Sequence, residues 1–196
     1  MKGNWSKAIN FKTIIYLNVN SDILLKSNRR NDLLEIILEW IGHKKMELIY
    51  RGSRDGKTSQ SFHKKCDNQG PTICLFENEK GYIFGGYASI SWTNSGCGHS
   101  APESFLFTLT NIYGTPPTKF PNIDTKNSVY HLSNQGPCFY DDIWIKSDFE
   151  KEDTYMTFPR AYKDTLGKGK SIFKTDYDNN KNYVKIKEIE VFKISN

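Results

Sequence analysis

Residues 72–87 read TICLFENEKGYIFGGY, and this stretch decides the fold. Two apolar runs flank a polar segment at 77–81 that ends in glycine, a pattern typical of a β-hairpin. Gly85 and Gly86 lie inside the second run. Paired glycines within a strand predict either a β-bulge or a neighbouring backbone or aromatic ring packed closely over them. We therefore expect an antiparallel strand pair at the centre of the fold.

Strand-like segments continue on both sides of this hairpin. In residues 104–110, Phe105, Phe107 and Leu109 share one side of a strand. Shorter strands are expected at residues 46–50, 128–132 and 143–145. The aromatic content of 14% also suits a β-rich core, because aromatic side chains favour strands and bury large areas.

The last predicted strand, residues 183–194, changes its apolar parity. Val184 and Ile186 occupy even positions, whereas Ile189 and Val191 occupy odd ones. Side chains alternate between the two faces of a strand, so a regular strand would turn one pair outward. The change predicts a bulge near residues 187–188, or burial on both faces beyond it.

Two helices are expected. Leu33, Ile36, Ile37, Trp40 and Ile41 recur at helical spacing within residues 31–41, with Asn31 as N-cap and Gly42 just past the end. A second, shorter helix is expected at residues 58–66, with Phe62 and Cys66 on the same face.

The predicted elements define an α+β fold with a β-sandwich-like core of antiparallel sheets and a few flanking helices. Residues 21–196 form one domain, and residues 1–20 form an N-terminal arm or edge strand, with a β-like segment at 11–19. The length of 196 residues is sufficient for one complete hydrophobic core. We expect a monomer.

Composition narrows the possible functions. The net charge of +5 is small, and the lysines are scattered among acidic residues, so we expect no nucleic-acid binding. The four cysteines form no Cys-x-x-Cys pair, as expected of a reduced, cytoplasmic protein. No apolar run is long enough for a membrane helix or signal peptide, so no direct membrane insertion is expected.

Seven motifs, in order, resemble the TLDc domain family. Together they span roughly residues 21–194. They are WIG (40–42) leading to ELIYRGSRDG (47–56), SFHKKCDNQGPT (61–72), GYIFGGY (81–87), SW (91–92), FLFTL (105–109), GP (136–137) with DI (142–143), and EIEVF (188–192).

The resemblance implies a β-sandwich and a function in protein binding. Members of the family are linked to protection against oxidative stress, and several bind the peripheral sector of the vacuolar proton-pumping ATPase. The family supplies no settled catalytic residue, cofactor or metal to carry over. Residues 138–141 replace a stretch where relatives often have more glycine, and residues 158–173 resemble short protist members. A partner surface formed by the latter segment would therefore differ from the animal one.

Several polar and aromatic residues are candidates for partner binding or for bracing a site. Arg54 could bind a partner carboxylate bidentately, but the favoured interpretation is that Arg54 or Arg51 pairs with Asp55 or Asp67 inside the domain and holds the turn at 51–56. Trp92, Tyr87 and Trp144 could anchor an interface if they lie at the surface, but burial in the sandwich core is favoured for each. The candidates are Arg51, Arg54, Asp55, His63, Asp67, Trp92 and Glu188.

The alternative is a thiol-dependent redox enzyme that uses Cys66 or Cys138. A thiolate beside His63 would suit such chemistry, but the helical spacing turns Cys66 toward the core. A zinc site would need His63 and Cys66 beside Cys97 and His99, and Cys-x-His is an unusual spacing for zinc. Acidic pairs, Glu103 with Asp142 or Glu188 with Glu190, could be a general acid and base, but ordinary ion pairing is favoured. The sequence favours a binding domain over an enzyme.

Overall fold

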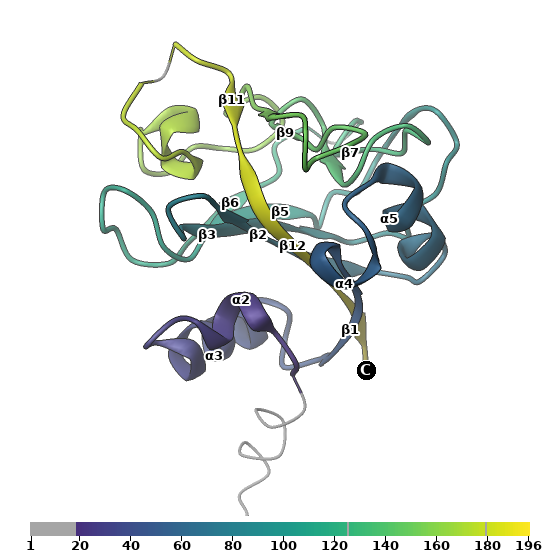
Figure 1. Ribbon diagram of the computed structural model, residues 1–196, viewed down its shortest axis with the longest axis horizontal. Helices are drawn as coiled ribbons and strands as arrows, with labels where there is room; N and C mark the ends of the chain where they lie inside the picture. The colour runs from purple at the N-terminus through teal and green to yellow at the C-terminus, as the bar shows by residue number, and fades with distance from the viewer. Residues whose placement is uncertain (1–18, 125, 179) are drawn as a thin grey trace, which may run out of the picture.

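Two antiparallel six-stranded sheets face each other in the computed structural model, which describes residues 19–124, 126–178 and 180–196 (Figure 1). The first sheet has the order β1 (Lys45–Arg51), β12 (Ile186–Ser195), β2 (Thr72–Asn78), β3 (Ile83–Ala88), β5 (Phe105–Thr108) and β6 (Thr118–Pro121). The second has the order β11 (Tyr183–Val184), β10 (Thr154–Tyr155), β9 (Ile143–Trp144), β8 (Cys138–Phe139), β7 (Val129–Tyr130) and β4 (Gly98–His99). The α+β sandwich predicted from the sequence is confirmed.

The helices flank the first sheet. They are α2 (Asp22–Leu25), α3 (Arg30–Trp40), α4 (Gly52–Asp55) and α5 (Ser59–Cys66), with the 3₁₀ helix η1 at Gly169–Phe173. α2 and α3 lie on the side of the first sheet that faces away from the second sheet (Figure 1). The predicted N-cap at Asn31 is wrong: Arg29 holds that position, without a side-chain cap. Of the predicted N-terminal arm, residues 1–20, only Val19 and Asn20 lie within the described ranges.

Two apolar clusters cover the two faces of the first sheet. The cluster between the sheets joins Phe76, Phe84 and Leu106 of the first sheet to Phe139 and Ile143 of the second. The other cluster packs α2 and α3 against the opposite face. Phe105 and Phe107, which the sequence predicted on one side of β5, both belong to this second cluster. Because both faces are covered, β2 and β3 are buried along their whole length.

The paired glycines permit the close approach of the two sheets. β2 and β3 pair without a register shift, so Gly85 and Gly86 form no bulge, and the predicted close contact is the explanation. A Cβ at Gly86 would lie 2.5 Å from the Phe139 ring, and one at Gly85 would lie 1.9 Å from the Cys74 carbonyl oxygen. A hydrogen atom is the only side chain that fits at either position.

The C-terminal segment, residues 183–195, contributes one strand to each sheet. β11 belongs to the second sheet and β12 to the first, with a register shift between Ile186 and Glu188 where β12 pairs with β2. Beyond this shift, residues 188–192 are all buried. The predicted bulge and the predicted burial on both faces therefore both occur.

Asp142 ties the second sheet to the loop that follows β10. Its two carboxylate oxygens accept hydrogen bonds from the backbone N–H groups of Arg160 at 2.7 Å and Ala161 at 2.8 Å. Burial raises the pKa of Asp142 to about 6, although these donors oppose the rise. A buried carboxyl group thus substitutes for strand pairing in this loop.

We expect Gly86→Ala to lower the free energy of unfolding by ~1–3 kcal/mol, because the methyl group displaces the Phe139 ring. Urea denaturation measures the effect. Gly114→Ala is the control, because Gly114 has a positive φ, unlike Gly86, and nothing lies within 4 Å of its Cβ position. That change should cost about 1 kcal/mol, for the left-handed backbone alone. A larger loss at Gly114 than at Gly86 would contradict the packing argument.

Asp142 should make stability depend on pH. Its folded pKa of about 6 exceeds the ordinary value of 3.8, so the folded chain holds a proton that the unfolded chain releases. The stabilisation is complete below the lower value and is lost as the pH rises through the upper one. Unfolding free energies of the wild type should fall over this range more steeply than those of Asp142→Asn, by about 1.4 kcal/mol per pKa unit. Parallel pH profiles for the two proteins would refute this role.

Candidate functional site

Arg51 connects α2 to the first sheet. Its Nε lies 2.8 Å from Glu190 Oε1, its Nη1 lies 2.8 Å from Asp22 Oδ2, and its Nη2 donates to the Asn20 carbonyl at 2.9 Å. Glu190 is completely buried and also accepts from the Ser21 hydroxyl at 2.6 Å. Burial raises the pKa of Glu190 even though Arg51 and Ser21 favour its charged form. Each of the three guanidinium nitrogens of Arg51 thus has a partner inside the domain, and the side chain is only 11% exposed.

The polar turn after β1 is braced by its own side chains. Arg54 Nη2 lies 2.7 Å from Asp55 Oδ2, and the same oxygen accepts from the Arg51 amide at 2.9 Å. Partial burial acts against ionisation, yet the bonds from Arg54 and Arg51 lower the pKa of Asp55. Glu188 Oε1 accepts from the Ser53 amide at 3.1 Å. Arg51, Arg54 and Asp55 thus pair with one another inside the domain, as the favoured interpretation of the sequence predicts.

His63 connects α5 to the second sheet. Its Nδ1 lies 2.8 Å from Asp67 Oδ1, and its Nε2 lies 3.0 Å from the carbonyl oxygens of both Leu132 and Gln135. Asp67 thus pairs with a histidine, not with an arginine of the polar turn. Both ring nitrogens of His63 already have partners, so this pair also braces the fold.

Trp92 and Tyr87 are not surface residues. Trp92 is 1% exposed, and its Nε1 donates to Thr72 Oγ1 at 2.8 Å in the core. Tyr87 is 9% exposed in the cluster under the helices. Trp92 therefore does not meet the condition for an interface anchor, and the favoured interpretation, burial in the core, describes it: its ring fills the space between the sheets beside Phe62 and Phe139.

The cysteines of the redox alternative are inaccessible. Cys66 and Cys138 are both fully buried, and burial raises the pKa of both thiols. Neither is the reactive thiolate that such an enzyme needs. Glu103 is exposed while Asp142 is held in the core, so this acidic pair is not a general acid and base.

The zinc hypothesis required His63 and Cys66 to meet Cys97 and His99. Cys97 Sγ and His99 Nε2 lie 3.5 Å apart, but Cys66 is in the core and His63 is bonded to carbonyl groups. In the part of the chain that the structure describes, no three His, Cys, Asp or Glu side chains form a group that could hold a metal ion. None of the helices within the described ranges is long and apolar enough to span a lipid bilayer.

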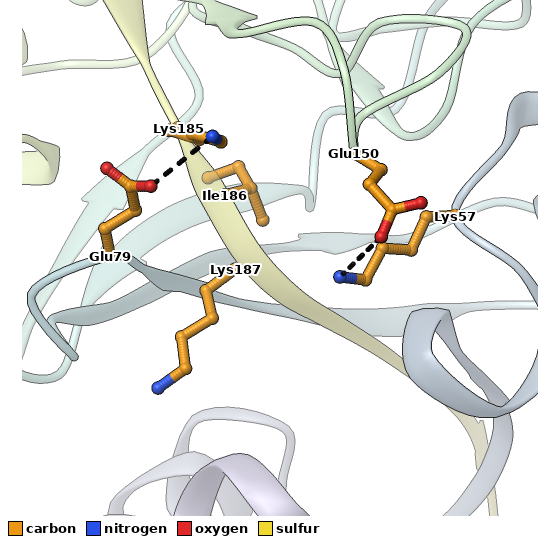
Figure 2. A pocket seen from close by; sticks show the side chains of 6 residues that line it. All are labelled: Lys57, Glu79, Glu150, Lys185, Ile186 and Lys187. Carbon is orange, nitrogen blue, oxygen red and sulfur yellow. Dashed lines mark ion pairs between the residues drawn. The ribbon is translucent and has the colours of Figure 1, made fainter.

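A surface groove of about 390 Å³ lies beside the start of β12 (Figure 2). Its basic groups are matched by acidic ones: Lys57 lies 3.8 Å from Glu150, and Lys185 lies 3.6 Å from Glu79. Figure 2 shows Lys187 directed away from these pairs, and its amine lies 3.0 Å from Glu77. The groove contains no nucleophile or imidazole, so its lining offers only paired charges.

An aromatic row crosses the outer face of the second sheet. Directly paired residues of neighbouring strands share a face, and the pairing runs from Tyr183 to Tyr155, Trp144, Cys138 and Tyr130. The residues beside these pairs, such as Val184 and Phe139, face the core. Tyr140, which follows β8, stacks on Tyr130 with ring centroids 5.3 Å apart. We define the aromatic row as Tyr130, Tyr140, Trp144, Tyr155 and Tyr183.

The row is partly exposed and carries one positive charge over its centre. Tyr183 is 54% exposed, and Trp144 and Tyr155 are half-buried. The Lys146 amine lies 5.9 Å from the ring centres of both Trp144 and Tyr155, within reach of a cation–π contact. Trp144 Nε1 has no hydrogen-bond acceptor among the described residues. The row therefore combines apolar area with an ammonium group, whereas the Trp144 indole nitrogen itself is buried.

Most of the aromatic row was missed by the sequence reasoning. Only Trp144 was considered, because strands of two residues are too short to display an alternating pattern. The signal in the sequence is a tyrosine or tryptophan next to a single buried residue, as in Val129–Tyr130, Ile143–Trp144 and Thr154–Tyr155. Without the strand register, these pairs cannot be aligned into one row.

Comparison with known proteins agrees with the motifs. The family model described as the TLDc domain matches residues 18–195. The mouse (Mus musculus) MTOR-associated protein MEAK7 is 29% identical over 102 residues, which are 47% of this chain and 22% of MEAK7. The match thus spans less than a quarter of that relative. Because the family model covers nearly all of the sequence, the chain belongs to the TLDc domain family.

Proposed function

We propose that this chain is a non-catalytic, regulatory protein-binding domain whose docking surface is the aromatic row. The proposal rests on the five large aromatic side chains that line one outer sheet face, four of which are linked through the strand register. The polar candidates from the sequence instead form contacts within the fold. Tyrosine and tryptophan dominate binding energy at protein interfaces, because they bury large areas with few rotatable bonds.

The dimensions of the aromatic row suit a protein partner. Neighbouring strands lie about 4.8 Å apart, so a row running from β11 to β7 extends about 20 Å across the sheet. Lys146 adds a cation at the centre, which favours a partner that presents carboxylate or carbonyl oxygens there. A flat aromatic strip with a central charge is suited to a helix or strand of another protein.

The partner that we propose is the peripheral sector of the vacuolar-type proton pump. The TLDc resemblance supports this choice, since several members of that family bind the pump. MEAK7 is named for an association with mTOR, which also fits a family that acts through protein contacts. Through the pump, the domain would contribute to resistance against oxidative stress, the property linked to TLDc proteins.

Tyr183→Ala should weaken binding of the full chain to the purified peripheral sector of the pump about 5- to 30-fold. This corresponds to ~1–2 kcal/mol, as expected when an interface tyrosine is truncated. Tyr177→Ala is a matched control, because Tyr177 is a similarly exposed tyrosine (63% against 54%) outside the row. Surface plasmon resonance with immobilised peripheral sector measures both dissociation constants. Equal affinities of the two variants would remove the aromatic row from the interface, and no binding by the wild type would reject the partner.

The link to oxidative stress has a separate cellular prediction. Cells that lack the protein should survive exposure to hydrogen peroxide less well than the parent strain. Expression of the Tyr177→Ala chain should restore survival, whereas the Trp144→Ala chain should restore it poorly, because it loses the centre of the row. Colony counts after peroxide treatment, at matched expression levels, compare the two. Full rescue by Trp144→Ala would separate stress resistance from docking through the row.

A further inference from the structure

Cys97 differs from the other cysteines of this chain. It precedes β4, the edge strand of the second sheet, and its side chain is exposed. The other three, Cys66, Cys74 and Cys138, are buried. All four lie in described parts of the chain, so the folded domain presents one accessible thiol. No second accessible cysteine can form a disulfide with it inside the domain.

A histidine and a serine surround the Cys97 thiol. Cys97 Sγ lies 3.5 Å from His99 Nε2 and 3.5 Å from Ser95 Oγ, and the serine oxygen lies 2.7 Å from the same histidine nitrogen. A thiol and a hydroxyl can both donate, so an unprotonated Nε2 accepts from both. The imidazole is therefore placed to receive the thiol proton.

A second, buried histidine supports the first. The rings of His131 and His99 stack with centroids 4.2 Å apart, and His131 is 2% exposed. Its Nδ1 is bonded to Thr93 Oγ1 at 2.9 Å, while its Nε2 has no partner among the described residues. Burial lowers the pKa of His131 to about 4, so this ring is neutral at neutral pH. The neutral His131 ring therefore adds no charge beside the His99 ring.

Backbone hydrogen bonds connect the Cys97 segment of this cluster to the His131 segment. The His131 amide donates to the Cys97 carbonyl at 3.0 Å, and the Gly96 amide donates to the His131 carbonyl at 2.8 Å. The cysteine and the stacked imidazoles therefore belong to one hydrogen-bonded strand pair. The thiol–imidazole geometry is set by this pair and not by a free loop.

We propose that Cys97 is a thiol–disulfide exchange site, which forms a mixed disulfide with low-molecular-weight disulfides while His99 acts as the base. The thiol proton moves to His99 Nε2, and the thiolate attacks one sulfur of the reagent. The reagent S–S bond breaks as the new bond to Cys97 forms, and the departing thiolate takes the proton from His99. The new S–S bond uses an electron pair of the Cys97 sulfur, and the electron pair of the reagent's S–S bond leaves with the departing sulfur, so one disulfide replaces another and no further oxidant or reductant is needed. An external thiol reverses the reaction, because no second cysteine of the domain is accessible.

Reaction of the full, reduced chain with glutathione disulfide at neutral pH tests this proposal. Intact-protein mass spectrometry should show one adduct, and peptide mapping should place it on Cys97. The rate constant should fall at least ~10-fold in His99→Gln, which lacks the base. Ser95→Ala is the matched control, since it alters the same cluster but leaves His99, and its rate should not be lower than that of the wild type. Circular dichroism establishes that each variant is folded.

Three results would overturn the assignment. An adduct on Cys66, Cys74 or Cys138 of the folded chain would show that another thiol reacts. Equal rates for the wild type and His99→Gln would leave Cys97 exposed but not activated. An equal fall in Ser95→Ala and His99→Gln would trace the effect to distortion of the cluster. The assay requires no pump component, so its outcome is independent of the proposed docking.

Discussion

The contact between Gly86 and the Phe139 ring sets how closely the two sheets approach. The second sheet consists of two-residue strands, which share few hydrogen bonds, so its position depends on apolar side chains packed against the first sheet. Phe139 is at the centre of that packing, with Trp92 and Tyr162 against its ring. The outer face carries the aromatic row only because the inner face is held in register. A small residue in one sheet thus governs the surface of the other.

The polar residues that attract attention in the sequence serve this architecture. Arg51 and Glu190 bind α2 to the first sheet, and Arg54 pairs with Asp55 in the polar turn. His63 connects α5 to the second sheet. A buried charge is tolerated only with a partner, which is distant in sequence for Arg51 and Glu190 but adjacent for Arg54 and Asp55. These polar residues stabilise the fold through ion pairs and hydrogen bonds inside the domain. The surface suited to a partner is instead built from tyrosine and tryptophan.

The sequence was a sound guide wherever an element was long enough to show its period. The hairpin at 72–87, the helix ending before Gly42 and the parity change near residues 187–188 all follow from local patterns. The helix start did not follow, and the neighbours that bury Trp92 could not be named. Arg29 precedes the helix without a side-chain cap, so no capping signal in the sequence marks its start. Trp92 is buried by residues 20 or more positions away, such as Thr72 and Phe139. The aromatic row and the stacking of His131 on His99 need the strand register, which two-residue strands conceal.

The short strands of the second sheet have a consequence for how the domain meets other molecules. A sheet with one or two residue pairs per ladder can be deformed locally without breaking a long hydrogen-bond network, unlike the ten-residue β12 below it. The domain is therefore stiff on its helix-covered side and compliant on its aromatic side. Compliance lets a recognition face mould itself to a curved or uneven target while the rigid side preserves the overall shape.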